Sequence, residues 1–459
     1  MSESTAPHYV QTIRERCRVC YTCVRECPAK AIRILGGQAE VIAERCIGCG
    51  NCIRVCSQKA KQVISSIETV AALLEGEAPV AAILAPSFPA EFPDKDPRRV
   101  VGALKQLGFA TVHEVAFGAD LVSRALRQLL EKDGARRHIT TACPAIVSYI
   151  EKYHPSLIGS LTPLVSPMIA TARALRHGRT GEFRIVFIGP CIAKKGEVGR
   201  STLAGEVDAA LTFSELRRMF ANAGIEARSV PPADFDPPLG GLGTLYPLSG
   251  GMFQSAAIQE DLLSTDFVSA EGRTSFVEVI KELESGALNA KLLELLCCNG
   301  CAMGAGMTSK NPLFVRRTQI SRYARERHAS MDREAWEREM ERYAGLDLRV
   351  TFSPDDQRDA MPSRELIREI MSRIGKLTPE DELNCGACGY DTCIEHAEAI
   401  ARGVAQSEMC LPYTIDQLRK TVGELAHSHE QLQDTQEALM HSEKLASMGQ
   451  LAAGIAHEV

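Results

Sequence analysis

Apolar and polar positions between residues 80 and 225 alternate in short segments of two kinds. The run VAAILAP at 80–86 is apolar and ends at a proline, which predicts a buried strand followed by a turn. RRVVGALKQLGF at 98–109 has apolar residues at helical spacing and predicts an amphipathic helix. Further strand-like segments lie at 110–117, 138–144, 183–191 and 208–213, and further helix-like segments at 123–131 and 214–224. This alternation is typical of an α/β domain with mostly parallel strands, whose ligands bind at the carboxyl ends of the strands.

The C-terminal segment 415–459 has a different pattern. Leucine recurs every seven residues, at Leu418, Leu425, Leu432 and Leu439, with Ile415 and Val422 three positions before the first two. These heptads predict a coiled-coil helix, and we expect a parallel homodimer rather than one helix packed on its own domain. The charge-rich segment 316–343 predicts a solvated helix without chemistry.

Composition narrows the class of protein. The 459 residues suggest about three domains, and 45% hydrophobic with 24% charged residues exclude a disordered or membrane-embedded chain. The net charge of −6 does not indicate the positively charged surface that nucleic-acid-binding proteins have, so we expect no nucleic-acid partner. The N-terminal segment has no apolar leader and no stretch of about 18 apolar residues occurs, so we expect a cytoplasmic protein without a membrane span.

Seventeen cysteines are the unusual feature, and in a reducing compartment clustered thiols favour metal over disulfides. Two copies of the spacing Cys-x2-Cys-x2-Cys-x3-Cys occur within residues 1–62 and predict two [4Fe–4S] clusters, with a zinc or disulfide knuckle as the alternative. The segment resembles a two-cluster ferredoxin, in which the fourth cysteine of each run binds the other cluster. One cluster would then be held by Cys17, Cys20, Cys23 and Cys56, and the other by Cys46, Cys49, Cys52 and Cys27.

Three motifs within residues 63–350 carry a second resemblance: TTACPAI at 140–146, GPCIAKKGE at 189–197 and ELLCCNGCAMGAGM at 294–307. They are similar to the catalytic domain of the [FeFe] hydrogenases and their sensory relatives. The resemblance implies a [4Fe–4S] cluster on Cys143, Cys191 and Cys301, with Cys301 bridging to a di-iron subsite. The fourth ligand is Cys298 or Cys297: the preceding glutamate favours Cys298, whereas the spacing of catalytic members gives Cys297.

Other residues of these motifs have roles implied by the same resemblance. Lys194 would face a cyanide of the di-iron subsite, Glu197 would be a supporting or proton-path carboxylate, and Gly300 would let the loop approach the cluster. Ala142 stands where catalytic members have a cysteine that relays protons. Alanine carries no proton, so we expect slow turnover of H2 at best. Met303 and Met307 also depart from the catalytic pattern, which leaves the presence of the di-iron subsite open.

A third cysteine group lies within residues 351–414. Its spacing, Cys385-x2-Cys388-x4-Cys393-x16-Cys410, is similar to that of the small four-cysteine [4Fe–4S] module of redox complexes. Zinc is the alternative, since four thiolates suit it equally. With three other cluster sites in the chain, we expect iron–sulfur.

The last residues, SEKLASMGQLAAGIAHEV, resemble the first helix of the phosphoacceptor domain of sensor histidine kinases. The resemblance implies that His457 is the phosphoacceptor and that Glu458 orients it or accepts its proton. The sequence ends at Val459 inside this motif, so we expect phosphotransfer to need an ATP-binding domain that the printed sequence does not contain.

Together these features predict an α/β multidomain protein: a two-[4Fe–4S] ferredoxin fold, a hydrogenase-like α/β domain, a small Fe–S module and a coiled-coil helix. Our first hypothesis is a redox or H2 sensor that feeds a two-component phosphorelay, with a redox partner protein at one end and a response regulator at the other. The alternative is a hydrogenase-like enzyme or electron-transfer protein with low H2 turnover. A third interpretation is a cluster-assembly or structural protein.

Overall fold

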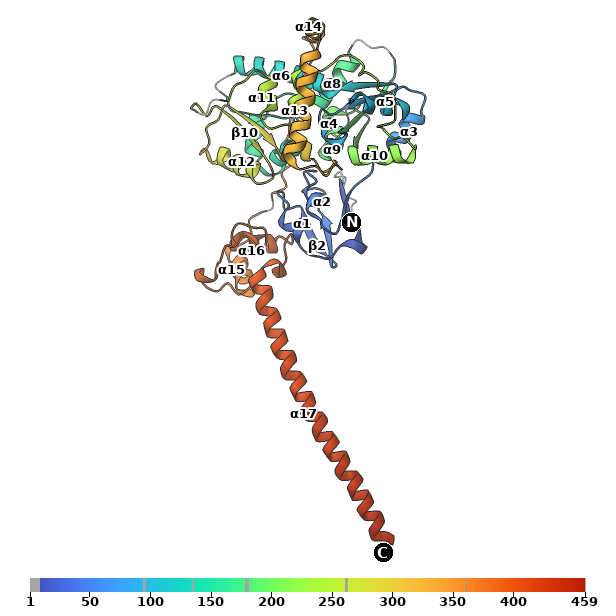
Figure 1. Cartoon of the computed structure of the whole chain (residues 1–459). Coiled ribbons are helices and arrows are strands. Elements are labelled where there is room, and N and C mark those ends of the chain that lie inside the picture. Colours follow the sequence, from blue (N-terminus) through green and yellow to red (C-terminus); the bar gives the residue numbers. More distant parts are fainter. Residues whose placement is uncertain are drawn as a thin grey trace. The chain divides into compact units, whose positions relative to one another are not determined.

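The computed structural model describes residues 9–93, 96–133, 136–177, 181–260, 263–358 and 360–458, with the side chains of 454–458 left out. The chain forms two compact units, Met1–Asp359 and Ala360–Val459. Figure 1 shows their elements. Among the described residues, no helix combines the length and the apolar character needed to cross a membrane.

The N-terminal part of the first unit has two short antiparallel pairs and two short helices. Strand β1 (Val10–Thr12) pairs with β4 (Lys61–Val63), and β2 (Ile32–Leu35) pairs with β3 (Gln38–Val41). Helices α1 (Thr22–Arg25) and α2 (Asn51–Val55) each begin after a residue in the left-handed region, Tyr21 at φ 59° and Gly50 at φ 70°. Each cysteine run thus turns sharply into one helical turn, which gathers its thiols on one side.

A four-stranded parallel sheet forms the centre of the larger part, in the order β6–β5–β8–β9. Its strands are β5 (Val80–Leu84), β6 (Thr111–Glu114), β8 (Arg184–Gly189) and β9 (Ala209–Thr212). All residues of β5 and β9 are buried, as expected for a sheet covered on both faces. Helices that contribute apolar residues to this core include α3 (Ile67–Glu75), α5 (Arg98–Gln106), α6 (Val115–Lys132), α8 (Pro167–Arg176) and α10 (Phe213–Asn222).

A second parallel sheet has the order β10–β11–β7. Its strands are β7 (His138–Ile139), β10 (Phe267–Glu271) and β11 (Leu292–Leu296), and the nearby helices are α7 (Pro144–Tyr153), α11 (Gly251–Ser255) and α12 (Ser275–Ser285). The predicted parallel α/β pattern is therefore present, but it is divided between two sheets. The strand expected over 138–144 has only two residues, because β7 pairs with two residues of β11 and Pro144 already begins α7.

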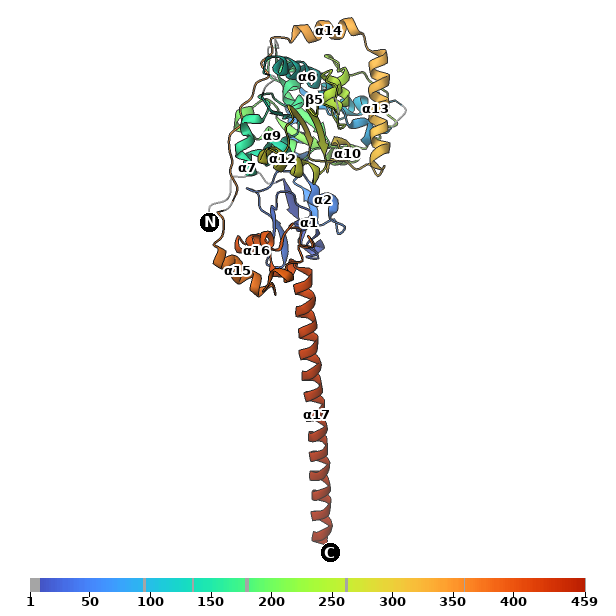
Figure 2. The same ribbon diagram turned by 90° about the vertical axis from the view of Figure 1, so that its left-hand side faces the viewer.

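The charge-rich segment forms α13 (Leu313–Ser330) and α14 (Arg333–Arg342), which run in different directions (Figure 2). Helix α13 has the predicted solvated face, but its other face is buried through Arg316, Ile320, Tyr323 and Ala324. Buried Arg316 donates to the carbonyl oxygens of Ala302, Ser309 and Asn311, and the Tyr323 hydroxyl donates to Glu114. An arginine on a helix can be buried when carbonyl oxygens accept its hydrogen bonds.

The second unit contains α15 (Arg364–Arg373), α16 (Cys393–Ala401) and α17 (Leu411–Glu458). Helices α15 and α16 share a small core of Ile370, Met371, Ile374 and Ala397. Helix α17 is continuous over 48 residues. Residues 351–358, which the sequence placed with the cysteine module, belong to the first unit, where Asp355 and Gln357 donate backbone hydrogen bonds to α7.

Candidate functional site

Three predicted iron ligands converge on one buried cavity. Cys143 follows β7 and precedes α7, Cys191 follows β8 and precedes α9 (Ala193–Val198), and Cys301 lies in the loop after β11. All three line a cavity of about 90 Å³. Carboxyl ends of parallel strands from both sheets therefore meet here, which is where such sheets bind ligands.

Cys297 and Cys298 have different surroundings. Burial raises the pKa of Cys298 well above its usual value, and the thiols of Cys191, Cys143 and Cys301 raise it further. The Cys297 thiol instead donates a hydrogen bond to Cys49 of the N-terminal part. Cys298 has the other three cysteines as electrostatic neighbours, which agrees with the interpretation of Cys298 as the fourth ligand; the choice between the two cysteines stays a prediction.

The cavity suits a redox group with anionic ligands. Its wall is apolar except for the cysteines, Lys194, Ser87 and Tyr246, whose hydroxyl is hydrogen-bonded to Ser123. The Lys194 Nζ donates to Glu197 at 2.6 Å and to Ser166 at 2.8 Å, and all three side chains are buried. The Ser87 hydroxyl is fully buried and has no hydrogen-bond partner in the described part of the chain. A buried ammonium and an unpaired hydroxyl at one cavity fit a polar or anionic ligand there.

The sequence reasoning missed Ser87. The signal was the APS triplet after the buried run 80–84, since a serine that directly follows a parallel strand lies at the binding edge of the sheet.

Glycines allow the third motif to approach the second. A Cβ on Gly304 would lie 2.5 Å from the Pro190 oxygen, and one on Gly306 would lie 2.9 Å from the same atom. Gly300 has φ +70°, and a Cβ there would lie 2.8 Å from the Pro247 oxygen. Substitution of these positions would push the loop away from Cys191.

The ferredoxin thiols gather in two groups. Burial raises the pKa of Cys52 well above its usual value, and its neighbours Cys49, Cys27 and Cys46 raise it further. Burial also raises the pKa of Cys23, whose thiol neighbours are Cys20, Cys56 and Cys17. These are the same two quartets as the crossed ligand sets expected from the ferredoxin pattern.

Backbone amides point at several of these sulfur atoms. The N–H groups of Ala31, Gly48 and Ala60 donate to the Sγ atoms of Cys27, Cys46 and Cys56 over 3.3–3.4 Å. Hydrogen bonds to sulfur stabilise the thiolate and help to set the potential of a cluster bound there.

In the second unit, Cys388 has Cys410 and Cys385 as electrostatic neighbours. Cys393 begins α16, and its N–H donates to the Asn384 side chain at 2.8 Å. Three of the predicted ligands thus lie near one another, and the fourth is fixed at the start of the helix.

A single metal ion such as zinc would need closely grouped thiols. Among the described residues, no group of three or more His, Cys, Asp or Glu side chains is spaced to hold a single metal ion. Four thiolates on one Zn²⁺ at about 2.3 Å would lie only about 3.8 Å from one another. The described cysteine groups do not meet this requirement for a single ion.

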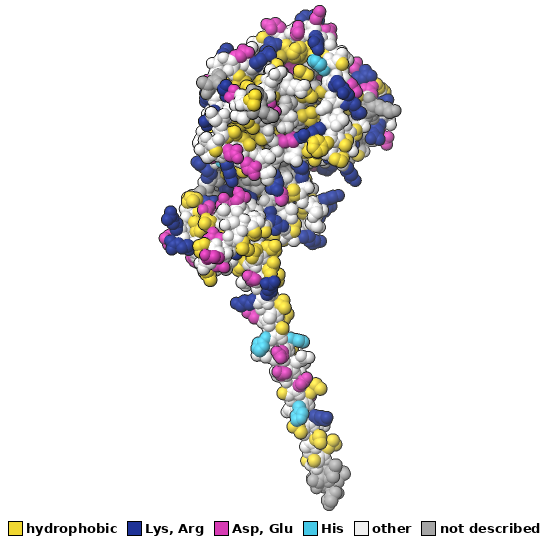
Figure 3. Space-filling view, turned by 60° about the vertical axis from the view of Figure 1, so that its left-hand side comes forward, with side chains coloured by type: hydrophobic (Ala, Val, Ile, Leu, Met, Phe, Trp, Pro, Cys, Tyr) yellow, Lys and Arg dark blue, Asp and Glu magenta, His cyan; other side chains and the backbone are white. Residues whose placement is uncertain are grey.

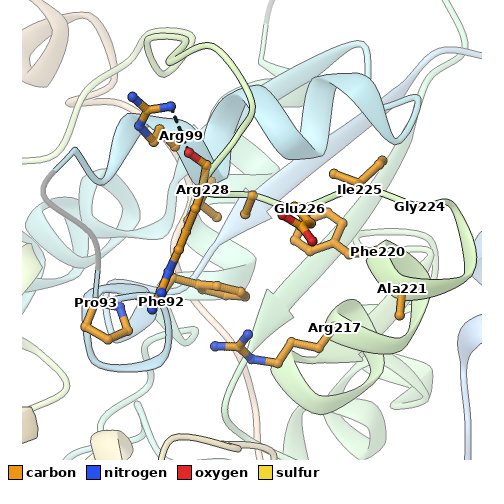
Figure 4. Close-up of a pocket in the computed structure, with 12 residues that line it drawn as sticks. Phe92, Pro93, Arg99, Arg217, Phe220, Ala221, Gly224, Ile225, Glu226 and Arg228 are labelled. Atoms are coloured by element: carbon orange, nitrogen blue, oxygen red, sulfur yellow. Dashed lines mark hydrogen bonds between the residues drawn. The ribbon is translucent and has the colours of Figure 1, made fainter.

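Two further features involve no cysteine. His457 and Glu458 fall within the bounds of α17, but their side chains lie outside the described residues. A larger cavity, of about 630 Å³, is lined by Phe92, Phe220, Arg99, Arg217 and Arg228 (Figure 4). None of its described lining residues is a cysteine, so its volume does not mark the iron chemistry.

Comparison with known families matches three regions of the chain. Residues 78–305 match the "Iron only hydrogenase large subunit, C-terminal domain", residues 9–57 the "4Fe-4S dicluster domain" and residues 381–412 an Fe-S cluster family.

Curated relatives are distant. Iron hydrogenase 1 of Clostridium pasteurianum is 25% identical over 273 residues, which are 49% of this chain and 48% of that protein. The periplasmic [Fe] hydrogenase large subunit of Nitratidesulfovibrio vulgaris is 27% identical over 45% of this chain and 62% of its own length. The cytosolic Fe-S cluster assembly factor NAR1 of Vanderwaltozyma polyspora is 36% identical over 18% of this chain and 16% of its own. The chain thus spans about half the length of the hydrogenases it matches.

A solved [FeFe]-hydrogenase HydA1 variant from Chlamydomonas reinhardtii shares the fold, with a TM-score of 0.54 and 17% identity over 64% of this chain and 99% of that one. The chain therefore carries the C-terminal domain of an iron-only hydrogenase large subunit, a 4Fe-4S dicluster domain and an Fe-S module, and it is a divergent [FeFe]-hydrogenase-like iron–sulfur protein.

Proposed function

We propose that the chain is a hydrogenase-like electron-transfer protein, in which electrons pass between the ferredoxin clusters and a hydrogenase-type iron site with low H2 turnover. The observation that carries the proposal is the convergence of Cys143, Cys191 and Cys301 on a buried cavity that also contains Lys194. A redox partner protein would exchange electrons with the ferredoxin part.

Packing supports an electron route from the ferredoxin part to this cavity. A Cβ on Gly50 would lie 2.5 Å from the Ala305 side chain and 2.6 Å from that of Ile192, and one on Gly48 would lie 3.1 Å from the Ala193 Cα. The second cysteine run is therefore in direct contact with the loops that carry Cys191 and Cys301.

The residues around the cavity define what the site does. Cys143, Cys191, Cys298 and Cys301 would hold a [4Fe–4S] cluster, and a di-iron group bound beside it would supply the redox chemistry of H2. Glu197 and Ser166 hold the Lys194 ammonium in place, so that it is oriented before any anionic ligand binds. Ala142 also lines the cavity and offers no proton, so proton delivery limits turnover.

Infrared spectroscopy with iron counts tests the proposal. The chain is expressed anaerobically with hydrogenase maturation enzymes, and H2 evolution from a reduced viologen is measured on the same samples. We expect about sixteen irons, the content of four cubanes, plus those of a di-iron group, together with CO and cyanide bands and slow H2 evolution. Cys191→Ala is the matched control, because it should lose the bands and keep the ferredoxin signals.

Other results would change the conclusion. About sixteen irons without CO or cyanide bands would leave a multi-cluster redox protein and remove H2 from the proposal. Failure to bind iron would overturn it and favour a structural role. Turnover comparable to that of efficient hydrogenases would show that Ala142 does not limit the site.

A sensor of redox state or H2 is the second candidate function. The observation that favours it is a row of exposed leucines along α17, which we call the leucine stripe. Leu418, Leu425, Leu432 and Leu439 are each 58–69% exposed, and hydrophobic side chains lie along this helix in Figure 3. A helix whose apolar residues recur every seven positions buries them by pairing with another helix. We propose a homodimer through this stripe.

In this second candidate, His457 and Glu458 are the phosphoacceptor pair of a complete kinase, and a response regulator receives the phosphoryl group. Phosphorylation of the complete gene product under H2 and under argon tests it, with His457→Gln as the control. Equal phosphorylation under both gases, in the presence and absence of a reductant, would refute the sensor.

A further inference from the structure

The cavity of about 630 Å³ takes no part in the proposed function, and its lining combines positive charge with an apolar floor. Residues of α5, of α10 and of the segment 224–228 that follows α10 line it. Three arginines, Arg99, Arg217 and Arg228, are among them, and we call the cavity the arginine pocket. Its volume is within the range of about 300–1,000 Å³ that is typical of small-molecule sites.

Buried aromatic rings form the apolar floor of the arginine pocket. Phe92 and Phe220 are 7% and 4% exposed, and their ring centroids lie 6.3 Å apart at an interplanar angle of 62°. Val100 and Ile225 are also buried and line the same cavity. Aromatic rings pack favourably against a further ring in edge or offset arrangements. The floor therefore suits a ligand with a flat apolar body.

The guanidinium of Arg217 is held in place before any ligand binds. Its Nε donates to the carboxylate of Glu91, which is fully buried, and its Nη2 donates to the Glu91 carbonyl oxygen at 2.6 Å. The guanidinium carbon lies 4.5 Å from the centre of the Phe92 ring. Within the described residues the Nη1 group has no hydrogen-bond partner, so N–H donors of this fixed fork remain for a ligand.

Arg99 fixes the loop that carries Arg228. Its Nη1 donates to the carbonyl oxygens of Arg228 at 3.0 Å and of Val230 at 2.9 Å. Figure 4 shows the first of these bonds, and it shows the Arg228 side chain extending toward Phe92. The side chains of Arg217 and Arg228 thus both approach the apolar floor.

The charge of the arginine pocket suits a ligand with one negative charge. Among the described residues, three arginines and Glu226 line the pocket, and Glu91 pairs with Arg217, which leaves one positive charge in excess. A guanidinium binds a carboxylate through two parallel hydrogen bonds.

We propose that the arginine pocket binds a small organic monoanion of the class of aromatic carboxylates. Its carboxylate would lie on Arg217 and Arg228, and its ring would lie on Phe92 and Phe220. This inference is independent of the proposed function, because it requires no bound cluster.

Isothermal titration calorimetry of the full chain under anaerobic conditions tests the proposal, with naphthoate as the probe. We expect saturable binding to a single site. Naphthalenemethanol has the ring without the charge, and inorganic phosphate has the charge without the ring. Each should bind at least about tenfold more weakly than naphthoate, since each lacks one of the two interactions.

Variants at the lining of the arginine pocket locate the binding. Arg228→Met should weaken naphthoate binding about tenfold, and Arg217→Lys should also weaken it, because lysine keeps a charge beside Glu91 but not the fork. Ala221 is exposed on α10 and lines the pocket, so Ala221→Trp should fill the space and abolish binding. Arg218→Met is the matched control, because Arg218 is an exposed neighbour on the same helix that does not line the pocket. Far-UV circular dichroism checks that each variant is folded.

Several results would overturn the proposal. One is the absence of saturable naphthoate binding, and another is unchanged binding in folded Arg228→Met and Ala221→Trp, because naphthoate would then occupy a different site. Equal affinity for naphthalenemethanol would show that the charge is not recognised, and equal affinity for phosphate would show that the ring is not. Tighter binding of AMP than of naphthoate would replace the aromatic carboxylate by a nucleotide.

Discussion

Restoring a thiol at position 142 should restore proton delivery to the hydrogenase-type site. Ala142 is partly buried, packs against the main core and lines the cavity beside Cys143, Lys194 and Cys301. Ala142→Cys adds one sulfur atom next to a cavity of about 90 Å³, so the added atom has room and the fold should tolerate it.

The expected gain in the rate of H2 evolution depends on which residues could carry a proton onward from position 142. A positioned general acid contributes about 10²–10⁴-fold, or about 2.7–5.4 kcal/mol of activation free energy. Glu197 is the nearest carboxylate of the second motif, and its Oε2 accepts a hydrogen bond from Lys194 at 2.6 Å. This carboxylate is already engaged by Lys194 and is therefore not a free group to which position 142 could pass a proton. We therefore expect the lower end of the range, about 10²-fold.

H2 evolution from a reduced viologen, normalised to the intensity of the CO and cyanide bands, measures this gain per intact site. Ala142→Val is the control that fills the same space without a proton. The reasoning is refuted if the bands are normal in Ala142→Cys and its normalised rate stays within about twofold of the unmodified chain, well below the gain expected of a general acid.

Four further predictions concern stability, the second unit and assembly. Lys195→Met should lower the free energy of unfolding by about 3–5 kcal/mol in anaerobic denaturant titrations, because it leaves Glu215 buried without its ion-pair partner at 2.8 Å. Burial opposes ionisation of Glu215, but Lys195 and hydrogen bonds lower its pKa below the usual 4.5. Its stabilisation is therefore present above pH 4.5 and lost as the pH falls through the folded pKa, so Glu215→Gln should flatten stability in that acid range. Cys385→Ser should remove about four irons and leave the other EPR signals unchanged; a loss of about eight or more would refute an independent site. Leu425→Asp combined with Leu432→Asp should convert a dimer into a monomer in sedimentation experiments, and an unchanged mass would exclude the stripe as the interface.

Cysteine spacing was sufficient to anticipate which ferredoxin thiols lie together, because the ligands of each run are local and the two runs repeat. The choice between Cys297 and Cys298 could not be made in the same way. Both follow the same strand, and the hydrogen-bond partner that distinguishes Cys297 is Cys49, which lies almost 250 positions earlier in the chain. A contact of that sequence separation leaves no trace in local spacing.

Local pattern also located β5, β8, β9 and α5, since each is a short apolar or amphipathic segment. It failed where pairing is long-range. The segment 110–117 was expected as one strand, but β6 ends at Glu114 and α6 begins at Val115. Glu114 accepts hydrogen bonds from Tyr323 and from the Gly240 N–H, so this turn depends on segments more than 120 residues away.

The two candidate functions differ in what they predict for Ala142→Cys in the complete kinase. If the protein is an electron-transfer enzyme, faster proton delivery raises H2 turnover and leaves phosphorylation unaffected. If it is a sensor, slow turnover is useful, because the H2-bound state must last long enough to bias the paired helices. Faster turnover would shorten that state, so the difference in phosphorylation between H2 and argon should shrink. If the difference in phosphorylation between H2 and argon stays the same while H2 evolution rises, the hydrogenase-type site does not control the kinase. The reason is that a ligand shifts an equilibrium only by stabilising one of its states.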